Sequence, residues 1–232
     1  MGRNASLLRH CGGPHDLTPA HTTSSWEFRG VTGGEAAVIA FLEGRPELYV
    51  GRRLFHIGIG NGALPQALGS GLRRYVGITI SLPELGQFEA RFRGADQYAG
   101  YLFNKHDPRA YGVIEGRFDI IVDVNLKSYT CCEEHFEALM QFYLDRLSGD
   151  GIIVTAESGL RFGWAGKMSV AHTPGADPKP ALAEYRVLGA EGLQALCARY
   201  RLALAAVPVI GGGRDAEFSD TVWVASRREK PL

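Results

Sequence analysis

One stretch of the chain constrains its fold more than any other: an apolar run that ends in three glycines spaced by two. The run over 54–59 leads through Gly58 and Gly60 to Gly62. Such a run is typical of a buried strand, and a turn of this kind is made most easily by residues without a Cβ atom. Its backbone can approach a ligand closely, with a helix N-terminus behind it. The pattern predicts a strand over 53–59, a helix over 63–68 and a nucleotide-like cofactor at the turn. A glycine-rich turn without a ligand is the alternative.

Helix patterns recur along the chain, each after a capping residue. The capping signals are Thr32 with Glu35, Ser81, and Thr130 with Glu133. They predict helices over 36–42, from Ser81 to Phe92, and from Thr130 to Leu147. We expect the glycine-containing residues 148–151 to end the last of these. A further helix is predicted over 191–200.

Seven strand patterns alternate with these helices. They cover 53–59, 75–80, 101–104, 118–123, 152–156, 202–210 and 221–226. The strands in the first half are apolar on both faces, which is typical of a mostly parallel sheet covered by helices on both sides. The last two strands have a shorter link and predict an antiparallel hairpin at the sheet edge. The expected fold is therefore α/β, a three-layer sandwich around a seven-stranded sheet.

The chain is expected to form one domain with two irregular segments. Residues 1–24 are rich in Gly, Pro, His, Ser and Thr and predict a flexible N-terminal arm. Residues 25–232 then form the single domain. Within it, the irregular stretch 157–188 has the length of a lid or a substrate-binding insertion, and it carries Trp164 and His172.

Composition excludes several classes of function. Lys plus Arg equals Asp plus Glu at 25 each, so the chain lacks the basic surplus that favours a nucleic-acid partner. It has no apolar run of about 18 residues, so no membrane span is expected. The four cysteines lack metal-type spacing, and we interpret them as reduced thiols of a cytoplasmic protein.

The order of elements over residues 50–228 resembles the class I S-adenosylmethionine-dependent methyltransferases, whose fold is Rossmann-like. The run from His56 to Gly62 aligns with that family's glycine-rich first motif, and residues 75–81 fall where the second strand meets the cofactor ribose. Asp107 falls at the position that commonly holds the adenine amino group, and the strand ending at Asp123 matches the fourth motif, beside the transferred methyl group. The resemblance implies S-adenosylmethionine as cofactor and S-adenosylhomocysteine as product. The cofactor-binding residues that it implies are His56, Gly58, Gly60, Asn61, Gly62, Thr79, Ile80, Ser81, Asp107 and Asp123.

Two positions depart from the family pattern. His56 and Thr79 stand where the family usually has an acidic residue. Their uncharged side chains weaken the expected electrostatic hold on the methionine amine and on the ribose hydroxyls. Thr79 also looks like the Thr-Leu-Ser variant of cyclopropane synthase-like members, and its hydroxyl can still hydrogen-bond a ribose without charge assistance.

A narrower similarity is to the macrocin-type sugar O-methyltransferases and runs through residues 123–127 and 136–139. Val124 stands where that group has a metal-binding aspartate, and Lys127 stands where it has the histidine base. Valine cannot ligate a metal, so no metal is expected to be required. Lys127, Glu157 and His172 are the catalytic candidates, with Lys127 as a base only if burial or a nearby cation depresses its pKa.

The expected function is methyl transfer to a small-molecule acceptor, on a hydroxyl of a sugar or specialised metabolite. The alternatives are N-methyl transfer to a small-molecule amine and a non-catalytic subunit that binds a partner through residues 157–188. The departures at His56 and Thr79 favour the non-catalytic alternative. Whether the chain forms a homodimer is left open.

Overall fold

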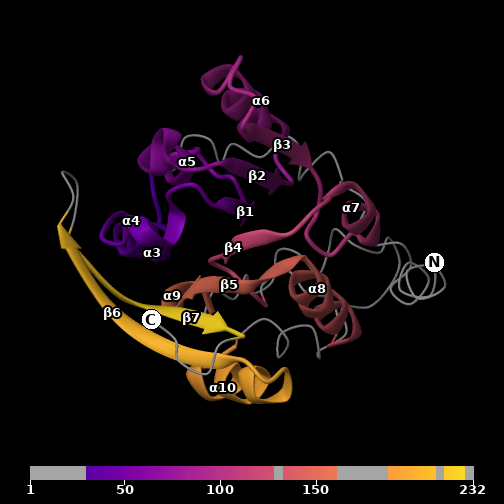
Figure 1. The fold of residues 1–232 in the computed structure, drawn as a ribbon. Helices are drawn as coiled ribbons and strands as arrows, with labels where there is room; N and C mark the ends of the chain where they lie inside the picture. The colour runs from indigo at the N-terminus through magenta and orange to yellow at the C-terminus, as the bar shows by residue number, and fades with distance from the viewer. Residues whose placement is uncertain (1–29, 128–132, 161–187, 213–216, 228–232) are drawn as a thin grey trace, which may run out of the picture.

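The computed structural model describes residues 30–127, 133–160, 188–212 and 217–227. These residues form a seven-stranded sheet in the order β3-β2-β1-β4-β5-β7-β6 (Figure 1). The first five strands pair in parallel, whereas β7 is antiparallel to both of its neighbours. The predicted mostly parallel sheet with an antiparallel C-terminal hairpin is therefore confirmed. The strands are β1 (Arg53–Ile57), β2 (Arg74–Thr79), β3 (Tyr98–Leu102), β4 (Phe118–Asp123), β5 (Leu147–Ala156), β6 (Ala203–Gly212) and β7 (Glu217–Ser226).

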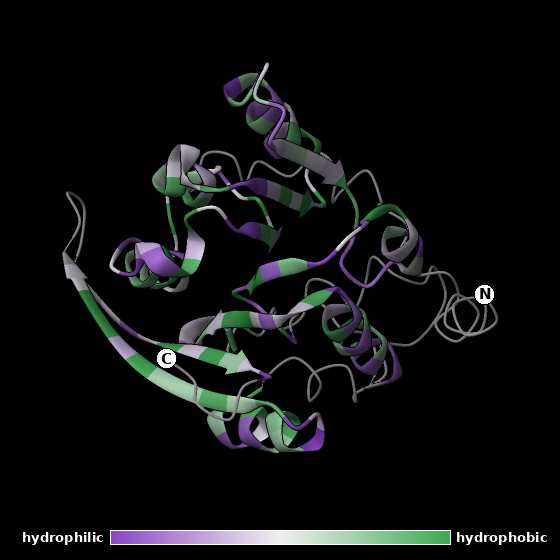
Figure 2. Cartoon of the chain, in the orientation of Figure 1, coloured by the Kyte–Doolittle hydropathy of each residue, from purple (hydrophilic) through white to green (hydrophobic). Residues whose placement is uncertain are grey.

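Helices cover both faces of this sheet. Side chains of α3, α5 and α6 share one buried cluster with one face of the strands, and side chains of α7, α8 and α10 share a second cluster with the other face. Figure 2 shows long green stretches on β5, β6 and β7, and helices that alternate green and purple. The described helices are α3 (Gly33–Glu43), α4 (Pro46–Tyr49), α5 (Ala63–Leu68), α6 (Leu82–Arg91), α7 (Pro108–Val113), α8 (Glu133–Arg146), α9 (Glu157–Leu160) and α10 (Ala190–Arg199), with a short 3₁₀ turn, η2 (Gly69–Gly71).

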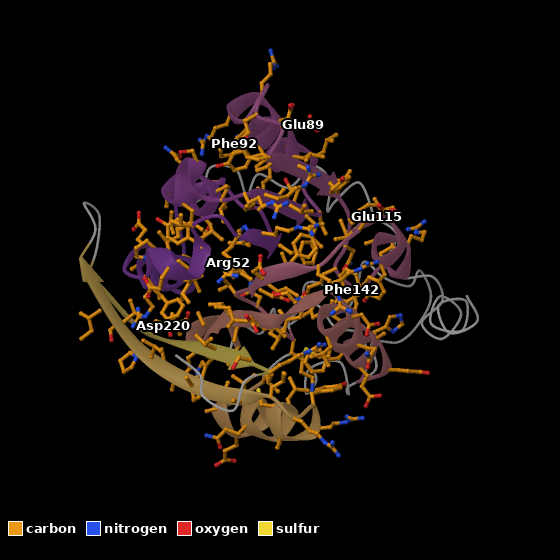
Figure 3. All side chains as sticks on the ribbon, viewed as in Figure 1. Arg52, Glu89, Phe92, Glu115, Phe142 and Asp220 are labelled. Carbon is orange, nitrogen blue, oxygen red and sulfur yellow. The ribbon has the colours of Figure 1, made fainter. Side chains whose placement is uncertain are left out.

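Successive residues of strand β1 pack on opposite faces of the sheet, and this explains how the two clusters form. Leu54 packs in the cluster with α3 and α5, whereas Phe55 packs in the cluster with α8. The ring of Phe55 lies 6.0 Å from the ring of Phe142, which α8 presents to the sheet (Figure 3). Because successive side chains of a strand point to opposite faces, an apolar residue at every position requires a helix layer on each side.

Capping residues set two of the helix starts as predicted. The Thr32 hydroxyl accepts a hydrogen bond from the backbone N–H of Glu35 at 3.3 Å, at the N-terminus of α3. The Ser81 hydroxyl accepts one from the backbone N–H of Glu84 at 3.3 Å, at the N-terminus of α6. The predicted cap at Thr130 lies outside the described residues.

Several predicted boundaries are wrong. Strand β1 ends at Ile57 and not at residue 59, and β3 covers 98–102 instead of 101–104. Residues 148–151 belong to β5 and not to a turn, because Leu147 is fully buried and pairs with Phe118 before the register shifts. The short helix α7 was not predicted, and α9 occupies the start of the stretch that was expected to be irregular.

The predicted arm over 1–24 and residues 161–187 of the expected lid lie outside the described residues. In the described parts of the chain, no helix combines the length and the apolar character that crossing a membrane requires.

Candidate functional site

A cavity of about 320 Å³ lies at the carboxyl-terminal ends of the parallel strands. Ligands of open α/β sheets bind at this edge, where the strand order reverses between β1 and β4. Six segments contribute to its wall: the first turn of α3, the loops after β1 to β4, and α9. The described lining residues are Thr32, Gly33, Gly34, Glu35, His56, Ile57, Gly58, Gly60, Ile78, Thr79, Ile80, Glu84, Phe103, Asn104, Lys105, Asp123, Val124, Asn125, Ser158 and Gly159.

The glycine turn after β1 forms one side of the cavity. Gly58, Gly60 and Gly62 have φ angles of +80°, +57° and +75°, a region that residues with a Cβ atom rarely adopt. The backbone N–H of Gly58 donates to the carbonyl of Ile78 at 2.8 Å, which ties the turn to the end of β2. The glycine spacing therefore has a structural cause, and at Gly58 no atom lies within 4 Å of the place where a Cβ atom would stand.

Two predicted residues of this turn lie beyond the cavity. Asn61 accepts a hydrogen bond from the backbone N–H of Ala63 at 3.0 Å, and Gly62 is the N-cap of α5. Both residues shape the start of α5, and neither is among the described lining residues. Their assignment to cofactor binding stays a prediction.

His56 is a buried and neutral member of the cavity wall. Its side chain is 1% exposed, and its Nδ1 shares a hydrogen bond of 2.8 Å with the Tyr75 hydroxyl. Burial lowers the pKa of His56 from 6.5 to about 3. Burial also raises the pKa of Tyr75, with a further contribution from the charge of Glu35. Both rings are therefore uncharged near neutral pH.

A carboxylate stands at the end of β2, although the strand itself carries none there. The Thr79 hydroxyl donates to Oε2 of Glu84 at 2.6 Å and accepts from the backbone N–H of Ser81 at 3.1 Å. Glu84 lies in the first turn of α6, is 2% exposed, and lines the cavity together with Thr79 and Ile80. A buried carboxylate from the next helix therefore lies beside position 79, where the resemblance implies an acid.

The charged groups at the end of β4 form an ion pair with each other. The ammonium of Lys105 donates to both carboxylate oxygens of Asp123, at 3.1 and 2.9 Å. Asp123 also accepts from the Tyr143 hydroxyl at 2.8 Å and from the backbone N–H of Asn125 at 3.2 Å. Lys105 donates further to the carbonyls of Asn125 at 2.6 Å and Leu126 at 3.1 Å.

This network is buried, with Lys105 7% and Asp123 1% exposed. Burial lowers the pKa of Lys105, while the charge of Asp123 and its hydrogen bond act in the opposite direction. Three donor groups make four hydrogen bonds to the two oxygens of Asp123, so its carboxylate is already saturated by the protein. The network holds the loop after β4 against the loop after β3.

Other predicted site residues lie away from the cavity wall. Asp107 caps α7 and pairs with Arg109, whose Nη2 lies 2.6 Å from Oδ2. Ser81 caps α6 behind Thr79. The ammonium of Lys127 lies 5.1 Å from the centre of the Phe136 ring. None of these three acidic, hydroxyl or amine side chains is among the described lining residues.

The remaining catalytic candidates come from the start of the expected lid. Glu157 begins α9, and its neighbour Ser158 lines the cavity. Ser158 donates its hydroxyl to Oδ2 of Asp220 at 2.5 Å, which joins α9 to β7, where Figure 3 labels Asp220. His172 lies outside the described residues. The roles of Lys127, Glu157 and His172 stay predictions.

Three charged cavity residues were missed from the sequence: Glu35, Glu84 and Lys105. The pattern Ser81-x-x-Glu84 is a capping box and offered a signal that this carboxylate lies beside the end of β2. Glu35 was interpreted only as part of a cap. Lys105 belongs to no motif, and its role becomes visible only when the fold brings the loop after β3 against the loop after β4 at the same edge of the sheet. The described residues include no group of three or more His, Cys, Asp or Glu residues placed to hold a metal ion.

Comparisons by sequence find nothing: no protein-family model matches the chain, and no curated protein matches it. Comparisons by structure find methyltransferases. N-methyltransferase NodS from Bradyrhizobium japonicum WM9, in complex with S-adenosyl-L-homocysteine, matches with a TM-score of 0.53 at 15% identity, over 97% of this chain and 98% of NodS. Magnesium protoporphyrin IX methyltransferase from Synechocystis PCC 6803, with bound S-adenosylmethionine, matches with a TM-score of 0.51 at 16% identity, over 83% of this chain and 77% of that enzyme.

These likenesses establish the fold. The chain has the Rossmann-like α/β fold of the class I methyltransferases, with its seven-stranded sheet and antiparallel β7. The structures that share this fold carry names with different acceptors, among them a porphyrin. The acceptor of this chain is therefore a separate question from its fold.

Proposed function

We propose that this chain is an S-adenosylmethionine-dependent methyltransferase that acts on a small-molecule acceptor. One observation carries the proposal: the cavity at the carboxyl edge of the sheet joins the glycine turn after β1 to a buried carboxylate after β2. A fold alone does not define an activity. These two features lie where the class I resemblance expects the cofactor, and both NodS and the porphyrin enzyme were crystallised with the cofactor or its product.

In this proposal Glu84 binds the ribose hydroxyls. Its carboxylate lines the cavity and already accepts a hydrogen bond from the Thr79 hydroxyl, which fixes its position. A carboxylate accepts hydrogen bonds from two neighbouring hydroxyls more strongly than a threonine hydroxyl does, because the acceptor is charged. The missing acid at position 79 was one of two reasons to regard the chain as a non-catalytic subunit, and in this proposal Glu84 removes that reason.

On the adenine side, Phe103 and Asn104 line the cavity after β3, next to Asp107. Asp107 is 2% exposed and held by Arg109. We propose that the base lies against Phe103 and Asn104, with Asp107 shaping the loop that carries them.

The bound cofactor supplies a sulfonium methyl group, which the acceptor attacks in line so that the electrons of the carbon–sulfur bond pass to sulfur. The chain's own part is to align the acceptor and to take up its proton. Asn125 and Val124 line the cavity at the end of β4, held there by Lys105. We propose a hydroxyl acceptor at this place, as the macrocin-type similarity suggests, with Lys127, Glu157 or His172 as the group that receives the proton. An amine acceptor is the alternative.

Cytoplasmic location and homodimer formation remain predictions from the sequence. With a formal net charge of zero, the chain offers no general attraction to nucleic acid, and a small molecule remains the proposed partner.

Calorimetric titration with S-adenosylhomocysteine tests the proposal. The unaltered protein is expected to bind, and Glu84→Gln to bind about tenfold more weakly, because the charge-assisted hydrogen bonds to the ribose are lost. Glu89→Gln is the matched control, since Glu89 is exposed on the same helix (Figure 3). Absence of binding by the unaltered protein at millimolar concentration would contradict the proposal and favour a non-catalytic subunit.

A further inference from the structure

The carboxylate of Glu35 lies close to the glycine turn that follows β1. A Cβ atom built on Gly60 would lie 3.6 Å from Oε1 and 4.0 Å from Oε2 of Glu35. Glu35 is 8% exposed and lines the same cavity as Gly58 and Gly60. Helix α3 therefore places one carboxylate next to the turn after β1, although the two segments are well separated in the sequence.

This carboxylate lines the same cavity as the position on β1 where the resemblance implies an acid. His56 occupies that place, bonded to Tyr75 through Nδ1 at 2.8 Å. Burial keeps the imidazole neutral, so it neither attracts nor repels a cation in the cavity. The charge of Glu35 reaches this pair, since it contributes to the raised pKa of Tyr75.

The other charged side chains of the cavity wall lie at other parts of the cavity. Among the described residues that line it, the charged side chains are Glu35, Glu84, Lys105 and Asp123. Lys105 and Asp123 form an ion pair of 2.9 Å with each other. Glu84 accepts from Thr79 at the end of β2. Glu35 is thus the acidic side chain that serves the glycine-turn side of the described cavity.

The first turn of α3 holds Glu35 in a defined place. The backbone N–H of Glu35 donates to the Thr32 hydroxyl at 3.3 Å. A Cβ atom on the preceding Gly34 would lie 2.7 Å from Oγ of Ser158 and 3.0 Å from Cγ1 of Val124. The start of α3 therefore packs closely against Val124 after β4 and Ser158 of α9, and this packing together with the Thr32 cap sets where the Glu35 backbone lies at the cavity wall.

We infer that Glu35 binds the α-ammonium group of the methionine part of the cofactor, in the role that an acid at position 56 would otherwise have. The inference rests on the proposed function and names a binding residue for the same site. A carboxylate in the wall of a largely buried cavity attracts a primary ammonium more strongly than it does in water, because the effective dielectric constant is lower. The neutral His56 allows this by placing no competing positive charge beside the ligand.

The test compares two ligands that share the adenosine part. S-Adenosylhomocysteine carries the ammonium, whereas 5′-methylthioadenosine lacks the whole amino-acid part. Glu35→Gln is expected to weaken binding of S-adenosylhomocysteine by about tenfold to a hundredfold and to leave binding of 5′-methylthioadenosine within about twofold. Glu43→Gln, exposed at the other end of α3, is the control and should change neither affinity.

Each other outcome overturns a distinct statement. Equal weakening of both ligands would give Glu35 a structural role and overturn the inference, as would unchanged binding of S-adenosylhomocysteine. If the unaltered protein binds neither ligand, the proposed function itself fails. Deaminated S-adenosylhomocysteine provides a second measurement on the unaltered protein, which stays informative if Glu35→Gln does not fold. The inference requires it to bind at least about tenfold more weakly than S-adenosylhomocysteine, and equal affinity would overturn it.

Discussion

The two ends of the cavity use their charged residues in opposite ways. At the glycine turn and the end of β2, the buried residues Glu35 and Glu84 belong to the cavity wall. At the end of β4, Lys105 and Asp123 satisfy each other and the neighbouring backbone. The comparison teaches that a carboxylate at an expected cofactor position can be occupied by protein partners, while carboxylates that the sequence shows only as parts of helix caps can line the cavity.

The largest loss of stability is expected at the end of the cavity formed by Lys105 and Asp123. Lys105→Met leaves Asp123 buried without its cation, and removing one partner of a buried ion pair costs about 3–5 kcal/mol in the free energy of unfolding. Urea denaturation followed by circular dichroism measures this loss. The double variant Lys105→Met with Asp123→Asn should recover most of it, since no charge then remains unpaired. A loss below about 1 kcal/mol in the single variant would show that Asp123 is not closed off as described.

A smaller, pH-dependent effect on stability is expected from the neutral His56, in the wall near the glycine turn. Its pKa is about 3 in the folded protein and 6.5 ordinarily, so between these values the unfolded chain binds one more proton at His56. The free energy of unfolding should therefore fall as the pH drops below 6.5, by about 1.4 kcal/mol per unit, and stay level above it. At pH 5 this amounts to about 2 kcal/mol.

Comparing the unaltered protein with His56→Gln isolates this contribution, because the other histidines titrate in both. The difference in the free energy of unfolding between the two proteins, measured from pH 7.5 to pH 5, should narrow by about 2 kcal/mol. A constant difference across that range would mean that His56 is not held neutral.

The smallest effect on stability is expected in the glycine turn. Gly60→Ala forces a residue with a Cβ atom to adopt a φ angle of +57°, which costs about 1 kcal/mol. The added methyl group would also stand 3.6 Å from the Glu35 carboxylate, so binding of S-adenosylhomocysteine should weaken as well. Thermal unfolding and calorimetry measure the two effects. Gly86→Ala, in α6 with open space around it, should instead be neutral or stabilising.

The sequence predicted the sheet better than the site. Helix α5 and strand β4 have the predicted bounds, because their apolar spacing and glycine boundaries act locally. The strand over 147–156 was predicted too short, since Gly149 and Asp150 favour a turn and only the burial of Leu147 against Phe118 overrides them.

In the site, Gly58 and Gly60 line the cavity and have a left-handed φ angle, a need that a glycine pattern shows in the sequence, and their assignment to cofactor binding stays a prediction. The positions that depend on a side chain from another element were missed. Glu35 comes from a helix that precedes the motif, and its distance from Gly60 follows from the packing of α3 against β5 and β7. No local pattern encodes such a distance.

The place of β7 in the sheet has a consequence for how the chain folds during synthesis. This strand follows β6 in the chain but lies between β5 and β6, with five register pairs to β5 and ten to β6. Until residues 217–226 have left the ribosome, the nascent sheet ends at β5 and exposes an unpaired edge. Strand β1 and the glycine turn are therefore synthesised early, but the sheet that contains them is completed only when β7 pairs with β5 and β6.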